Sequence, residues 1–219
     1  MSFSQSLVNK VILVILVSLI GLLIFTLYRP LPVNETTMIE IEKGYGLNQV
    51  IDRLNEQELV NRPLILKGYV KVFKRSDDIK AGEYLISKTN NAIQLIQKIS
   101  EGSVYYHQIR LREGSTVNEL IDLFKNNDVL KKDKNFEDKN KIRSDLGLEI
   151  NSLEGLFHPD TYNYIKGDSF LDILKRSNLK HQKILNQLWS QRSISLPFKN
   201  SYEALTLASI IEKEGTEKK

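Results

Sequence analysis

The sequence contains no cysteine, so disulfide scaffolds, thiol nucleophiles and cysteine-ligated zinc sites are excluded. Histidine is scarce, and no pair among His107, His158 and His181 has the spacing of metal ligands on a helix. Neither an H-E-x-x-H motif nor a phosphate-binding G-x-x-x-x-G-K-[ST] loop occurs. We therefore expect no metal ion and no cofactor.

The sequence also lacks an excess of one charge sign. Its 31 Lys and Arg residues stand against 27 Asp and Glu residues, for a formal net charge of +4, and the two signs are mixed along the chain. Nucleic-acid binding is accordingly not expected. Apolar residues make up 41% and charged residues 26%, proportions typical of a folded globular protein, which excludes collagen-like and wholly disordered classes.

A long apolar run lies near the N-terminus. Residues 11–28 carry no charge and are bracketed by Lys10 and Arg29. At about 1.5 Å per residue this run forms a helix roughly 27 Å long, close to the roughly 30 Å hydrocarbon layer of a bilayer. A cleavable signal peptide has a shorter apolar core and a small-residue cleavage site. We therefore predict that residues 1–32 form a short cytoplasmic tail and a single transmembrane helix; a buried helix of a soluble core is the less favoured alternative.

The charges around this run predict its orientation. The segment before it carries Lys10 and the amino terminus but no acidic residue, which favours a cytoplasmic N-terminus. The remainder of the chain is then expected outside the membrane.

The exported part repeats one pattern at an interval of seventy positions. Each copy reads as an alternating strand, a glycine turn and an amphipathic helix. The matched residues are Ile39, Gly44, Asn48, Ile51 and Asp52 in the first copy and Ile109, Gly114, Asn118, Ile121 and Asp122 in the second. Residues 82–87 predict a further strand, and residues 93–99 a further helix. Small α+β modules follow from this order, and the module over residues 33–106 resembles LysM-like carbohydrate-binding domains.

Residues 125–143 are polar and rich in lysine, but acidic residues interrupt the positive charge. We interpret this segment as a solvated helix or linker and a candidate domain boundary, in preference to a patch for lipid headgroups or nucleic acid.

The segment Leu153–Tyr162, LEGLFHPDTY, is the first candidate for chemistry. Gly155 permits an irregular turn, and Pro159 favours an extended residue before it. Aromatic faces beside hydrogen-bonding side chains are what a pyranose ring needs, whereas a tight loop in which Asp160 and Thr161 bind the local backbone is an equal alternative. The predicted substrate-binding residues here are Glu154, Asp160, Thr161 and Tyr162.

The second candidate is the segment Tyr202–Gly215, YEALTLASIIEKEG, which predicts a helix with an apolar arc wide enough to be largely buried. Glu212 lies on one flank over Ala208 and Ser209, whose small side chains leave room for a substrate, whereas Glu214 lies over the bulkier Ile210 and Ile211. A carboxyl beside such a gap is expected to be partly desolvated, which favours its protonated form and suits a general acid. We predict Glu212 as the catalytic residue and Ser209 as a substrate contact; a surface glutamate at a helix end is the alternative.

In combination these features resemble the MltG/YceG-like family of endolytic murein transglycosylases. The resemblance rests on the order of an N-terminal anchor, a LysM-like module, the Leu153–Tyr162 segment and Leu207–Glu214, LASIIEKE. It implies an α+β catalytic domain over residues 107–219, with Glu212 as the catalytic glutamate. It also implies cleavage of the β-1,4 bond between N-acetylmuramic acid and N-acetylglucosamine within nascent peptidoglycan strands, leaving 1,6-anhydro ends and terminating glycan elongation. The implied location is the bacterial inner (plasma) membrane, with the main domain periplasmic. The implied partners are peptidoglycan glycan strands, that membrane and peptidoglycan synthases.

The sequence departs from this family at its end, because members continue well beyond the Glu-Lys-Glu helix. We therefore expect the catalytic domain to be incomplete and the cleft to lack a wall, so that this chain is a truncated form with reduced or absent activity. The alternative function is a membrane-anchored peptidoglycan-binding module without catalysis.

Overall fold

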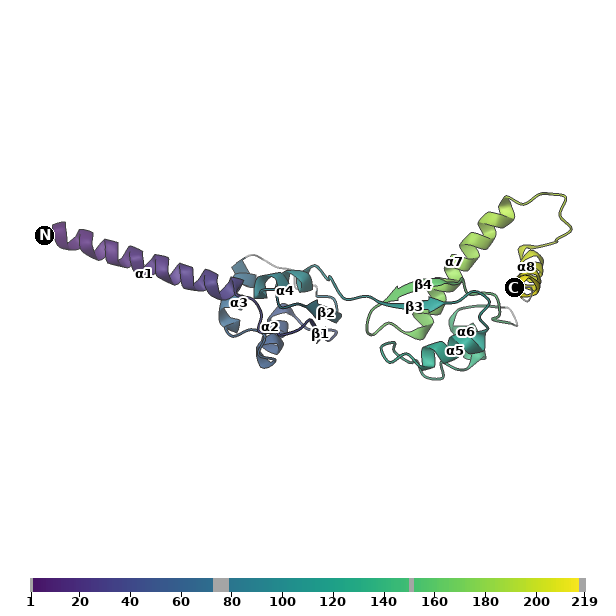
Figure 1. The fold of residues 1–219 in the computed structure, drawn as a ribbon, viewed down its shortest axis with the longest axis horizontal. Helices are drawn as coiled ribbons and strands as arrows, with labels where there is room; N and C mark the ends of the chain where they lie inside the picture. Colours follow the sequence, from purple (N-terminus) through teal and green to yellow (C-terminus); the bar gives the residue numbers. More distant parts are fainter. Residues whose placement is uncertain (1, 73–78, 150–151, 217–219) are drawn as a thin grey trace. The chain divides into compact units, whose positions relative to one another are not determined.

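The computed structural model describes residues 2–72, 79–149 and 152–216. The chain forms two compact units, Met1–Tyr105 and Tyr106–Lys219, each with its own antiparallel two-stranded sheet and its own helices (Figure 1). This confirms the predicted α+β class. The LysM-like character of the first unit stays a prediction.

Helix α1, Ser2–Tyr28, is long, and its Leu7–Tyr28 segment is apolar and long enough to cross a membrane. Only 6% of that segment is buried, so the structure does not place it in the core of a soluble unit. Its last turn differs, because Leu27 is 6% exposed and the following Leu31 is 5% exposed. The main-chain N–H of Leu31 also donates to the carbonyl of Asn90 at 2.8 Å. The end of α1 is therefore part of the first unit, where it contacts α3 and α4.

The rest of the first unit consists of β1 (Thr37–Ile41), α2 (Leu47–Glu56), α3 (Pro63–Val72), β2 (Gly82–Ile86) and α4 (Ala92–Ser100). Strands β1 and β2 pair in antiparallel register with Ile39 opposite Tyr84. Alternation turns one face of each strand inward, and the helices bury their apolar stripes against it. The innermost side chains are Leu47, Ile51, Leu54, Leu66, Tyr84, Ile86, Leu95, Ile96 and Ile99.

The second unit consists of β3 (His107–Leu111), α5 (Val117–Lys125), α6 (Lys139–Asp145), β4 (Asp160–Tyr164), α7 (Phe170–Ser190) and α8 (Ser201–Thr216). Strands β3 and β4 are antiparallel, with Ile109 opposite Tyr162. Phe124 of α5 and Phe170 of α7 pack ring against ring, 4.2 Å between centroids, at the centre of this core.

The predicted repeat is present in both units. In each copy the first strand runs into a turn at a glycine with positive φ, +93° at Gly44 and +70° at Gly114, and then into the buried stripe of a helix. These two glycines adopt a backbone conformation that side chains with a Cβ rarely adopt. The helix that follows Gly114 starts with a capping box between Thr116 and Glu119.

The prediction of a domain boundary at residues 125–143 is wrong, whereas the predicted solvated helix is present in part as α6, in which Ile142 is the buried residue. The segment lies inside the second unit, and it contributes Leu130, 4% exposed, and Ile142, 2% exposed, to the core. The side-chain oxygen of Asn127 accepts the main-chain N–H of Leu130 at 3.0 Å, which fixes the turn after α5. The apolar residues are too widely spaced among the charges to give a helical or strand period.

Candidate functional site

The Leu153–Tyr162 segment connects α6 to the sheet, as a loop that becomes strand β4 at Asp160. Its Leu153 and Leu156 side chains are buried in the core. Two buried polar residues of α7 hold its main chain: Asn178 donates to the carbonyl of Leu156 at 3.0 Å, and Ser177 donates to the carbonyl of His158 at 3.1 Å. The segment is therefore a loop in fixed position rather than a surface excursion.

Glu154 lies at the N-terminus of α5. Its Oε2 accepts the main-chain N–H of Val117, the first residue of that helix, at 3.0 Å. A carboxylate there satisfies an amide that has no partner within the helix and meets the positive end of the helix dipole. The predicted substrate-binding residue Glu154 thus ties the loop to a helix thirty-seven positions earlier in the chain.

Asp160 and Thr161 begin strand β4, and both side chains are exposed. Asp160 forms an ion pair with Lys180 of α7 and accepts the main-chain N–H of Thr161 at 2.7 Å. The Lys180 ammonium, and then this N–H, lower the pKa of the Asp160 carboxyl. Asp160 is therefore an anion turned to α7, whereas no such contact holds the Thr161 side chain within the described residues.

Tyr162 lies in the core and is 7% exposed. Its hydroxyl donates to the carbonyl of His158 at 2.8 Å. Tyr162 therefore helps to hold the loop closed through this hydrogen bond. Its side chain is covered by the core and is not open to a sugar.

Helix α8 forms where it is predicted, but the prediction that it is largely buried is wrong. Leu207, Ile210 and Ile211 are 42%, 53% and 62% exposed, and Ser209 and Glu212 are exposed as well. The partial desolvation expected of Glu212 is therefore not supplied by the described part of the chain. A helix with so wide an apolar arc needs neighbours on more than one side, and α8 has α7 and the Leu153–Tyr162 loop.

The contact between α8 and that loop is at Gly155. A Cβ at Gly155 would lie 3.8 Å from Cδ2 of Leu205, and Gly155 has a φ of +76°. At the other end of α8, the pKa of Glu119 is lowered by its main-chain and side-chain hydrogen bonds with Thr116 and, to a smaller extent, by the charge of Lys213. Lys213, next to Glu212 in the sequence, thus acts by its charge on the start of α5, where Glu154 is bound. The two predicted segments meet in space, with Asp160 turned to α7.

The contribution of α7 to the site is not predicted by the sequence patterns. Besides Ser177, Asn178 and Lys180, this helix carries His181, whose Nε2 is buried without a partner among the described residues. Burial, and then the charge of His158, lower the pKa of the His181 imidazole. The polar residues that interrupt the apolar stripe of this helix could have indicated this contribution. A buried polar side chain needs a hydrogen-bond partner elsewhere in the fold.

A metal site is not formed by any group of three or more His, Asp or Glu side chains within residues 2–72, 79–149 and 152–216. The chemistry available at the meeting of the two segments is that of carboxyl and hydroxyl groups.

The chain has an apolar N-terminal helix followed by two α+β units. In the second unit, the helix that carries Glu212 lies beside a loop fixed by α7. This order of elements defines the class of architecture. The model of the YceG-like family matches residues 39–219, and the chain belongs to this family.

Among relatives, the chain is 22% identical over 204 residues to a Bacillus subtilis protein named endolytic murein transglycosylase, covering 84% of this chain and 55% of that protein. The chain thus spans about half the length of this relative. A crystal structure of a YceG-like protein from Listeria monocytogenes aligns at 23% identity with a TM-score of 0.35, covering 71% of this chain and 57% of that one.

Proposed function

We propose that this protein is a membrane-anchored lytic transglycosylase that cleaves the β-1,4 bond between N-acetylmuramic acid and N-acetylglucosamine within nascent peptidoglycan strands. Membership of the YceG-like family carries the proposal, and the name of the Bacillus relative supports the class of reaction and the substrate. The apolar α1 supports anchoring in the inner membrane with the two units outside.

In the proposed reaction Glu212 is the acid and then the base. Its carboxyl protonates the glycosidic oxygen as the bond from that oxygen to C1 of the muramic acid breaks. The C6 hydroxyl of the same sugar then forms the new bond to C1, and its proton returns to the Glu212 carboxylate. Attack from within the same sugar has a high effective molarity, so neither water nor a second carboxylate nucleophile is needed.

The remaining predicted residues divide by their contacts. Thr161 and Ser209 have exposed side chains, so we propose these two as direct contacts to the glycan. Glu154, Asp160 and Tyr162 are engaged within the unit, and we propose that they act by positioning the loop beside α8. For Glu212 to act as an acid, the glycan itself must contribute the desolvation that the described residues do not supply.

The test is release of anhydro-muropeptides from purified peptidoglycan, measured by mass spectrometry, with the wild-type chain and the Glu212→Gln and Glu214→Gln variants. Glu214 lies on the same exposed end of α8, so its substitution is a matched control. We expect release by Glu214→Gln equal to that of wild type, which the sequence predicts to be reduced, and a loss of about 100-fold or more in Glu212→Gln, the lower range for removing a positioned acid. Release by Glu212→Gln equal to a measurable wild-type release would refute its role. Sedimentation with peptidoglycan without any product would favour the binding module instead.

A further inference from the structure

The first unit contains a pocket at the place where α1 leaves its apolar span. Its volume is about 290 Å³, near the lower end of the roughly 300–1,000 Å³ usual for small-ligand sites. One part of its lining is apolar and comes from α1 itself, through Leu22, Phe25 and Leu27. Another part is polar and comes from Arg29, Asn61 and Arg62. The pocket therefore has an apolar region and a cationic region.

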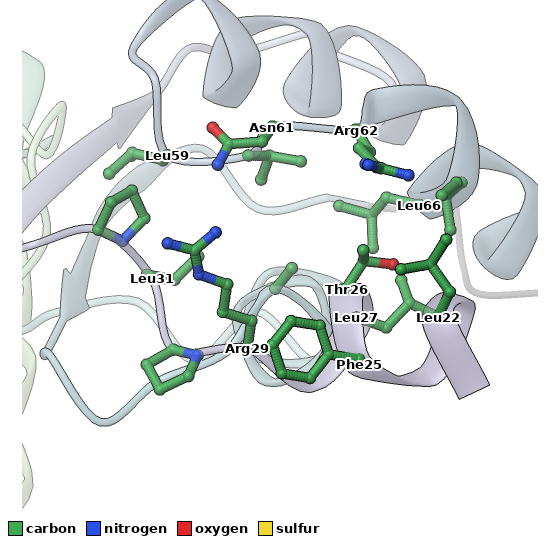
Figure 2. Close-up of a pocket in the computed structure, with 15 residues that line it drawn as sticks. Leu22, Phe25, Thr26, Leu27, Arg29, Leu31, Leu59, Asn61, Arg62 and Leu66 are labelled. Atoms are coloured by element: carbon green, nitrogen blue, oxygen red, sulfur yellow. The ribbon is translucent and has the colours of Figure 1, made fainter. Parts of the chain in front are cut away.

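The two arginines lie on different elements and share this pocket. Figure 2 shows the guanidinium of Arg29 reaching from the end of α1 toward the loop that carries Leu59 and Asn61, while Arg62 lies at the start of α3. Both residues are exposed, and in the part of the chain that the structure describes neither guanidinium has an ion pair or a side-chain hydrogen bond. Two guanidinium groups without protein partners are suited to a phosphate, which each can bind through two N–H groups.

The position of the pocket identifies which phosphate is available. Phe25 and Leu22 belong to the segment long enough to cross a membrane, and Arg29 is the first charge after it. When that segment spans a bilayer, its last turn lies at the boundary between acyl chains and headgroups. The apolar lining is then at the depth of the acyl chains, and the arginines are at the depth of the phosphates.

Helix α3 supports the same placement. Leu64 and Val72 lie two turns apart on one face of this helix and are 81% and 74% exposed. Helix α3 contacts α1, and its first turn lines the same pocket as the end of the span, whereas Leu64 lies on its exposed side. Helix α3 starts at Pro63, directly after Arg62, and a helix with exposed apolar residues beside a cation is suited to the surface of a bilayer.

We propose that this pocket binds one anionic phospholipid of the surrounding membrane, with its phosphate between Arg29 and Arg62 and the start of an acyl chain against Phe25 and Leu22. The bound lipid holds the first unit against the membrane surface. The inference rests on the anchoring part of the proposed function and is independent of Glu212 and of glycan cleavage.

The test is native mass spectrometry of the full chain in detergent, titrated with phosphatidylglycerol. We expect one lipid to be retained by wild type and the affinity to fall about 30-fold in Arg29→Gln/Arg62→Gln, at about five-fold for each cation near an anionic headgroup. The control Arg53→Gln/Arg112→Gln removes two exposed arginines elsewhere and is expected to retain the lipid. Ile65→Phe, which fills the pocket and keeps both charges, is expected to lose it.

Three further measurements identify which ligand the pocket binds. A diacylglycerol glycolipid without phosphate is expected not to bind, and millimolar glycerol 3-phosphate is expected not to displace phosphatidylglycerol. Retention that is unchanged in the Arg29→Gln/Arg62→Gln variant, or displacement by glycerol 3-phosphate, would overturn the proposal. Tighter binding of a polyprenyl pyrophosphate than of phosphatidylglycerol would likewise overturn the choice of lipid. Extraction of membranes at alkaline pH tests separately whether the apolar segment spans the membrane. Release of the chain by this treatment would contradict the membrane anchor, whereas loss of lipid binding alone would contradict only the lipid pocket.

Discussion

The buried amide of Asn178 offers a sharp test of how the Leu153–Tyr162 loop is fixed. Asn178 is 5% exposed, and its Nδ2 donates to the carbonyl of Leu156 at 3.0 Å, twenty-two positions earlier. In Asn178→Ala this carbonyl loses its donor while it stays buried. The cost of a buried polar group without a partner is about 1–3 kcal/mol. The higher helix propensity of alanine offsets about 0.5 kcal/mol of this destabilisation.

The free energy of unfolding of the second unit is therefore expected to fall by about 0.5–2.5 kcal/mol. For a domain of this size that lowers Tm by roughly 2–10 °C. The single tryptophan of the chain, Trp189, is on α7, so its fluorescence during thermal unfolding reports the second unit without the first. Circular dichroism follows both units.

The matched control is Asn186→Ala, the same substitution at an exposed position of α7. It changes helix propensity alone and is expected to leave the tryptophan-detected Tm unchanged or slightly raised. If Asn178→Ala and Asn186→Ala give the same Tm, the buried hydrogen bond does not hold the loop and the reasoning fails. If Asn178→Ala is destabilised as expected, the variant should also expose the loop to faster amide hydrogen exchange around Leu156.

Further predictions follow from other contacts. Gly155→Ala, at a φ of +76°, is expected to destabilise the second unit by about 1 kcal/mol, whereas Gly68→Ala, in open space within α3, is expected to stabilise its helix; denaturant titration of both variants decides this. Because the pKa of Asp160 is lowered by Lys180, the contribution of this carboxylate is present above its unfolded pKa and is lost as pH falls through its folded pKa, so the wild-type Tm should decline below about pH 4. Asp160→Asn should show a shallower decline, and an identical pH profile would contradict the ion pair's role. Leu31→Ala removes a side chain that is 5% exposed at the junction with α1 and should cost about 2–5 kcal/mol of first-unit stability, seen as faster proteolysis of that unit.

Local pattern was enough to predict much of this chain. The apolar run, the paired strand–glycine–helix copies and the helix that carries Glu212 were all read from periodicity, and the structure has them at these positions. The two short segments Leu153–Tyr162 and Tyr202–Gly215 also stand out in the sequence. These features succeed because strand alternation, helical spacing and turn glycines act over a few residues.

Other features could not be predicted because they depend on residues far apart in the chain. Residues 125–143 look like a solvated linker, yet Leu130 and Ile142 complete a core whose other members lie before and after them. The partner of the Asp160 carboxylate is twenty positions away on α7. No local signal reports such pairings.

The sequence by itself determined the membrane-span candidate, the two-unit α+β order and the identity of the acidic residues, since each of these is written in neighbouring side chains. Only the tertiary structure decided that Tyr162 is covered, that Glu154 binds the start of α5, that Glu212 is exposed and that Arg29 and Arg62 line one pocket at the end of α1. Burial and partnership are properties of the packed chain, because they depend on which surfaces meet after the elements have formed.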